Sequence, residues 1–318
     1  MPRKDRLSVG LPICIAVLIL IGLSSYVLPQ SHSEKLQRRS ASASSSRGKV
    51  GPRASPPLKT APEALSRNSA SFESAATANA RLQANLAWTF GSRPQRGWQI
   101  YEPLITHLIG SSGEPWSRVF ATRLAQWQTE NGLAADGVLD DKTLLKIIST
   151  LQSKRIRDRA YPSDDQLVTI PASDCYYPER PEELRRVERE TYKAYKRMVA
   201  AAVADRSLRL NASGGHLAAS EKFLKIVSAF RSREYQDQLR KQSPQSGRAG
   251  LAVNSPHFTG RALDLYVGGE PVSTKDNNRA LQTQTLVYRW LVQNAARFGF
   301  QPYFYEPWHW EYVEKKQE

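Results

Sequence analysis

The C-terminal half of the sequence predicts an α+β fold, with a small, largely antiparallel sheet flanked by helices. Apolar residues recur at helical spacing over 181–205 and 281–298, and the polar segment 232–241 also favours a helix. Residues 223–230 form a short apolar run and residues 262–267 alternate in polarity, which indicates two strands. Helices and strands in this irregular order are typical of α+β domains.

Residues 1–29 have the features of a membrane anchor or a signal segment. Arg3, Lys4 and Arg6 precede a long apolar run from Leu7 to Leu28. About 20 apolar residues suffice to cross a bilayer, and the basic flank favours the cytoplasmic side. We therefore expect the segment to anchor the protein in the inner or cytoplasmic membrane, with the rest of the chain in the periplasm or on the wall side. A cleaved signal peptide, which would release the protein, is the alternative.

Residues 30–97 are predicted to be a disordered linker, because they are rich in Ser, Ala, Pro and Arg and contain few large apolar side chains. Up to Ile100 the chain has 14 Lys or Arg against 4 Asp or Glu, which accounts for +10 of the net +15. This charge either keeps the linker solvated or attracts it to anionic lipid or wall polymer. The remaining two-thirds is only mildly basic and has no zinc-finger or RNA-binding signature, so we expect no nucleic-acid partner.

Residues 98–152 predict a small module of three helices, separated by Gly-Ser, Asn-Gly and Asp-Gly turns. Asp140 or Asp141 is suited to cap the third helix. The string Gln-x-x-x-Gly-Leu over residues 128–133, followed by Asp-Gly at 136–137, resembles the helical peptidoglycan-binding domain that accompanies many wall hydrolases. The resemblance implies wall binding, and a spacer with a similar helical core is the alternative.

The two cysteines restrict the kind of metal site that the chain can build. Cys14 lies in the N-terminal apolar run, so it is not expected to pair with Cys175, and the sequence has no Cys-x-x-Cys. Thiolate-rich structural zinc sites are therefore excluded. Any metal must be bound by His and carboxylate side chains.

Within residues 161–318, two histidines and one aspartate predict a site for one Zn²⁺ ion. His257 and Asp264 flank a loop with Pro and Gly that can bring them together, and His309 follows Glu306-Pro-Trp. Three protein ligands leave a fourth position open for water, which distinguishes catalytic from structural zinc sites. Glu306, near His309 but not a ligand, is the candidate general base. His and Asp ligands also suit several other divalent metals.

Arg231 is a third candidate group for chemistry, because it directly follows the apolar run that ends at Phe230. A fixed guanidinium there can stabilise an oxyanion or bind a terminal carboxylate. Taken singly, Asp264 and Glu306 are also explained as ordinary surface charges. We interpret the remaining histidines as solvated or structural: His32, His107 and His216.

The string Ser-x-His-x-x-Gly-x-Ala-x-Asp over 255–264, followed by Glu-Pro-Trp-His over 306–309, resembles the VanY-like D-Ala-D-Ala carboxypeptidase and dipeptidase metallopeptidases, including those of vancomycin resistance. The similarity covers about residues 222–313. It implies zinc on the three predicted ligands, Glu306 as general base and a transition-state role for Arg231. It also implies three substrate-binding residues: Ser255, Gln236 and Trp308.

Four residues qualify this resemblance. Ala229 and Phe230 replace the commoner Gly-Tyr before the arginine, which still keeps an aromatic residue. Arg261 adds charge beside the predicted metal loop, where it either shapes specificity or faces solvent. Trp308 is equally consistent with an ordinary core aromatic residue.

The resemblance implies an exported zinc-dependent D,D-carboxypeptidase that hydrolyses the terminal D-Ala-D-Ala bond of peptidoglycan stem peptides. Related metallopeptidases use the same ligands to cut internal bonds, so a peptidoglycan endopeptidase is the nearest alternative. A second class is a non-catalytic wall-binding protein, in which the helical module binds and the C-terminal domain is a scaffold. A third is a structural anchor between membrane and wall.

Overall fold

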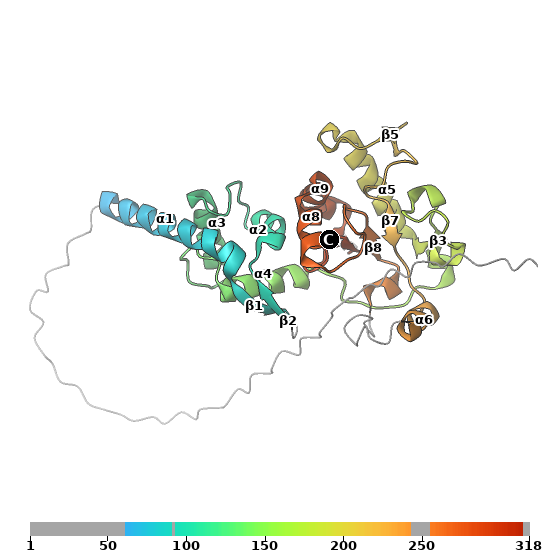
Figure 1. The fold of residues 1–318 in the computed structure, drawn as a ribbon, viewed down its shortest axis with the longest axis horizontal. Coiled ribbons are helices and arrows are strands. Elements are labelled where there is room, and N and C mark those ends of the chain that lie inside the picture. Colours follow the sequence, from blue (N-terminus) through green and yellow to red (C-terminus); the bar gives the residue numbers. More distant parts are fainter. Residues whose placement is uncertain (1–60, 91–92, 243–254, 314–318) are drawn as a thin grey trace, which may run out of the picture.

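A four-stranded antiparallel sheet, in the order β7–β8–β10–β9, lies at the centre of the C-terminal half. The computed structural model describes residues 61–90, 93–242 and 255–313. Its architecture is α+β, as the sequence predicts (Figure 1). Helices α1 to α4 lie on one side of the molecule and the sheet on the other, with α8 and α9 between them.

The described elements have the following bounds. The helices are α1 (Ala61–Asn85), α2 (Glu102–Leu108), α3 (Arg118–Glu130), α4 (Asp141–Ser153), α5 (Arg189–Ala204), α6 (Arg233–Gln242), α8 (Asp276–Gln284) and α9 (Leu286–Asn294). The strands are β1 (Ala87–Phe90), β2 (Arg93–Arg96), β3 (Leu167–Thr169), β4 (Arg186–Glu188), β5 (Ala212–Ser213), β6 (His216–Leu217), β7 (Ile226–Ser228), β8 (Ala262–Leu265), β9 (Phe300–Pro302) and β10 (His309–Tyr312). Short 3-10 turns include η1 (Gln99–Tyr101), η4 (Glu182–Leu184), η7 (Pro256–Thr259) and η8 (Ala295–Phe298).

The prediction of disorder over 30–97 is wrong for its second half, where α1 and the β1–β2 hairpin form. Helix α1 packs on α3 through small side chains, because Ala75 and Ala76 are buried. Buried Asn79 bonds the backbone of the turn before α4, donating to Gly137 O at 2.9 Å and accepting from Leu139 N at 2.8 Å. The prediction relied on large apolar residues, whereas this helix is packed through two alanines and the side-chain amide of Asn79.

The three predicted helices of residues 98–152 are present as α2, α3 and α4. Gln128 of the recognised string closes the turn between α3 and α4, since its Oε1 accepts from Gly137 N at 2.9 Å and its Nε2 donates to Val138 O at 3.0 Å. Asp140 caps α4 by accepting from Thr143 N at 2.8 Å. The string thus has a clear structural role, and its wall-binding role stays a prediction.

Two predicted helices of the C-terminal half are shorter than expected. The helix predicted over 181–205 begins only at Arg189, because Val187 pairs with Val168 in the β3–β4 ladder and Glu188 then caps α5. The helix predicted over 281–298 is interrupted at Thr285, whose hydroxyl caps α9 by accepting from Tyr288 N at 3.2 Å.

One continuous hydrophobic core joins the helical part to the sheet part. Phe304, in the loop before β10, stacks on Tyr101 of η1 with ring centroids 4.1 Å apart and contacts Trp88 of β1 edge-on. Buried Arg279 of α8 donates to the Tyr101 hydroxyl at 2.7 Å and to Tyr305 O at 3.2 Å. Trp88 and Tyr101 therefore support the loop that carries Glu306.

The predicted membrane segment, residues 7–28, lies outside the described residues. Within the part of the chain that the structure describes, no helix has both the length and the apolar character needed to span a membrane.

Candidate metal centre

The sheet brings the three predicted metal ligands together. Asp264 on β8 is directly opposite His309 on β10 in the antiparallel register. His257 lies in η7, the turn that enters β8. One ligand atom from each residue lies within 4.8 Å of the others, and all three side chains are buried.

Gly260 allows the turn to close over the neighbouring strand. Its φ of +66° is in the left-handed region, and a Cβ there would lie 2.9 Å from Glu188 N. The close approach lets Glu188 N donate to Gly260 O at 3.1 Å. The Gly of the sequence string therefore fixes the loop that holds His257.

Each histidine has one ring nitrogen held by an outer partner and the other directed at Asp264. His257 Nδ1 lies 2.6 Å from Ala229 O, and its Nε2 lies 3.3 Å from Asp264 Oδ2 without completing a hydrogen bond. His309 Nδ1 lies 3.0 Å from Asp264 Oδ1, and its Nε2 lies 3.2 Å from Glu311 Oε1. Outer partners of this kind fix the tautomer and orientation of metal-ligating histidines.

This donor set fits a zinc ion. Two ligands at the usual zinc distances are about 3.3 Å apart in tetrahedral geometry. The closest approaches of Asp264 to the two imidazoles, 3.3 and 3.0 Å, are near that value. The buried, unbonded Nε2 of His257 is also explained if a cation is its partner.

The carboxylates and imidazoles at the centre shift one another's pKa values toward the charged forms. Burial alone would raise the pKa of Asp264, but the two imidazoles hold it well below its ordinary value. Burial would lower the pKa of His309, yet hydrogen bonds to Asp264 and Glu311 raise it to about 9. Burial lowers the pKa of His257 to about 4, although the Asp264 carboxylate opposes this effect.

Glu306 is buried next to this cluster, and its Oε1 has no hydrogen-bond partner among the described residues. It lies in the loop between β9 and β10, where His309 N donates to Glu306 O at 3.0 Å. Burial raises the pKa of Glu306 to about 7, and the Asp264 carboxylate adds to the increase. A carboxylate that exchanges a proton near neutral pH is suited to general acid–base chemistry.

The structure places Arg231 beside the metal centre, directly after β7. Its Nη2 donates to Asp264 Oδ2 at 3.3 Å, while its Nη1 is buried and bonds no residue that the structure describes. Burial lowers the pKa of Arg231, although Asp264 opposes this effect. One edge of the guanidinium is therefore held by a predicted metal ligand and the other is free to bind an anion.

The three predicted substrate-binding residues are all buried. Gln236 on α6 has neither its amide oxygen nor its amide nitrogen bonded to a described residue. Ser255 Oγ accepts from His257 N at 3.3 Å and so caps η7. Trp308 lies in the hydrophobic core. Their contact with substrate stays a prediction.

Two residues of this site were missed from the sequence. Glu311 is two positions after His309 on β10, hence on the same face of the strand, and this spacing was the available signal. Arg155, just after α4, donates to Glu311 Oε1 from Nε at 2.9 Å and also from Nη2. No local pattern in the sequence connects Arg155 with the metal loop.

Residues 184–315 match a protein family described as VanY, D-alanyl-D-alanine carboxypeptidase. This part of the chain is similar to the VanY family. The match includes all the predicted metal ligands, Glu306 and Arg231. It begins after the helical part of residues 98–152 and does not include it. No curated protein matches the sequence. The match supports a peptidase, in agreement with the first hypothesis from the sequence.

Proposed function

We propose that the chain is a zinc-dependent D,D-carboxypeptidase that removes the terminal D-Ala from peptidoglycan stem peptides. The observation that carries the proposal is the combination of three converging ligands with Glu306, a buried carboxylate that has a free oxygen and a pKa near neutrality. A non-catalytic scaffold has no need of such a carboxylate, because burying it without a partner costs stability.

His257, Asp264 and His309 would hold the ion, and the metal, when bound, would activate water and polarise the scissile carbonyl. Glu306 accepts the proton of the attacking water and then donates it to the departing amine. The free Nη1 of Arg231 stabilises the negative charge that develops on the carbonyl oxygen. Gln236, whose amide has no described partner, is proposed to bind the peptide together with Ser255 and Trp308.

Two segments outside the VanY-like domain would determine where the enzyme acts. The basic and apolar segment of residues 1–29 would anchor the enzyme in the membrane and place the VanY domain outside the cytoplasm. The Gln-x-x-x-Gly-Leu module would hold it on the wall. Both features favour a polymeric substrate over a free dipeptide.

The test is hydrolysis of pentapeptide muropeptides by the full chain, with products identified by mass spectrometry. Glu306→Gln and chelator-treated enzyme run beside the wild type. Loss of one terminal alanine, abolished in both controls, is the expected result. Cleavage of an internal bond would indicate the endopeptidase instead. Intact substrate in the presence of bound metal would contradict both peptidase hypotheses.

A further inference from the structure

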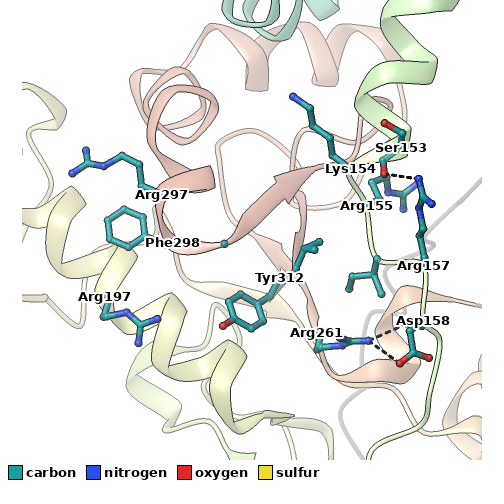
Figure 2. A pocket seen from close by; sticks show the side chains of 13 residues that line it. Ser153, Lys154, Arg155, Arg157, Asp158, Arg197, Arg261, Arg297, Phe298 and Tyr312 are labelled. Atoms are coloured by element: carbon teal, nitrogen blue, oxygen red, sulfur yellow. Dashed lines mark hydrogen bonds and ion pairs between the residues drawn. The ribbon is translucent and has the colours of Figure 1, made fainter. Parts of the chain in front are cut away.

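A basic cleft of ≈ 910 Å³ lies outside the metal centre, between the segment that follows α4 and the far end of the sheet (Figure 2). One wall is the segment 153–158, and the opposite wall includes Arg197 of α5 and residues 297–299 at the end of η8. Arg261, before β8, and Tyr312, at the end of β10, line the part between them. The cleft is thus built by segments from both halves of the chain.

The charge of the lining is strongly one-sided. Six of the 13 lining residues are cationic and one, Asp158, is anionic. The cationic residues are Lys154, Arg155, Arg157, Arg197, Arg261 and Arg297. A cleft lined by charges of one sign focuses the field and concentrates counter-ions inside it.

Among the residues that the structure describes, side chains neutralise only two of these cations. Arg155 pairs with Glu311, and Arg261 lies 3.9 Å from a carboxylate oxygen of Asp158. The other four form no ion pair with any residue that the structure describes: Lys154, Arg157, Arg197 and Arg297. All four are exposed, so their charges are available to a ligand that enters the cleft.

The residue types indicate the chemistry of that ligand. Five of the six cations are arginines, whose guanidinium forks bind oxyanions in a bidentate manner. A phosphate group has enough acceptor oxygens to bond two such forks at once. The volume of the cleft falls in the range of organic-ligand sites and exceeds what a single phosphate ion fills.

We propose that this cleft binds a ligand carrying several phosphate groups, either a phosphorylated small molecule or a phosphodiester polymer. Arg197 and Arg297 on one wall and Lys154 and Arg157 on the other would bind successive phosphates. Half-buried Tyr312 and Phe298 provide an apolar surface for the part between them. Binding of this ligand would be a function separate from peptide hydrolysis.

The test measures binding of inorganic tripolyphosphate and of poly(glycerol phosphate) to the full chain by isothermal titration. The double variant Arg197→Glu/Arg297→Glu removes two unpaired cations from the cleft without touching the metal centre. Because the variant removes two charge-assisted contacts and adds two repulsive charges, an affinity loss of at least about tenfold is expected. Peptide hydrolysis measured without the anion should be unchanged.

The matched control is Arg123→Glu/Lys146→Glu, which makes the same charge change at exposed positions of α3 and α4 outside the cleft. It accounts for non-specific attraction, including attraction to the basic residues before Ile100. The proposal requires the control to retain wild-type affinity within about twofold. Both double variants must also keep the wild-type melting temperature, and Arg197→Gln/Arg297→Gln should give an intermediate affinity.

Equal losses in the two Glu variants, or no binding of either phosphate probe, would overturn the proposal. If poly-L-glutamate of matched charge binds as tightly as the phosphate probes, the cleft is not selective for phosphate, and this part of the proposal is overturned. Tight binding of poly(glycerol phosphate) with weak binding of tripolyphosphate would identify the polymer as the source, and the reverse would identify a small molecule.

Discussion

Glu311 Oε1 lies 3.2 Å from Nε2 of His309, the ring nitrogen that does not face Asp264, and the same oxygen accepts from Arg155. Glu311 also accepts from Ile156 N at 2.9 Å through its second oxygen. A predicted metal ligand is thus oriented by a carboxylate that the segment after α4 keeps in place. The helical part of the chain reaches the metal centre through this contact.

Glu311→Gln should weaken zinc binding about 10- to 100-fold, because outer-sphere partners of ligating histidines contribute in that range. The measurement is a competitive titration with a chromogenic chelator. Glu190→Gln on α5, an exposed carboxylate that pairs with Lys193, is the matched control and should bind zinc as the wild type does. Unchanged zinc affinity in Glu311→Gln would show that Glu311 does not contribute to metal binding.

Glu306→Gln should abolish hydrolysis and yet stabilise the metal-free protein above neutral pH. Burial raises the pKa of Glu306 from 4.5 to about 7. A raised folded-state pKa contributes stability below pH 4.5, and this contribution is lost as the pH rises through 7. At pH 8 the variant should therefore exceed the wild type by up to about 3 kcal/mol.

This effect is measured by denaturant unfolding in the presence of a chelator at pH 4.5 and pH 8. The difference between variant and wild type should be larger at pH 8. The same difference at both pH values would mean that folding does not raise the pKa of this carboxyl, which would argue against its role as the base.

Arg231→Lys should lower kcat by about 10²- to 10³-fold, as expected when a donor to a developing oxyanion is lost. Lysine retains the charge near Asp264, so zinc affinity should change little. Steady-state kinetics and zinc titration on the same preparation separate the two effects. A parallel loss of zinc would show that Arg231 only supports Asp264.

Trp88→Ala should cost about 3–5 kcal/mol of stability, because the buried indole packs against Tyr101 and Phe304. Trp116 is 56% exposed, and Trp116→Ala should stay within about 0.5 kcal/mol of the wild type. Denaturant unfolding of the two variants compares a supporting tryptophan with an exposed one. A small cost at Trp88 would contradict the role of the hairpin in supporting the Glu306 loop.

The sequence allowed prediction of the ligands, the base and Arg231 because these residues stand in short strings with fixed spacing. It did not reveal the contact of Arg155 with Glu311, since these residues are far apart in the chain and each has an ordinary neighbourhood. Helix α1 was missed because it buries Ala75, Ala76 and Asn79 in place of large apolar residues. The break at Thr285 depends on a hydroxyl cap, which periodicity does not report.

The most direct test of the central claim is the zinc content of purified chains, measured by elemental analysis after dialysis against trace zinc. The account predicts one zinc per chain in the wild type and in Glu306→Gln, and loss of zinc in His257→Ala and in Asp264→Asn. Full zinc content in the two ligand variants, or none in a correctly folded wild type, would contradict the assignment of His257, Asp264 and His309 as the metal centre.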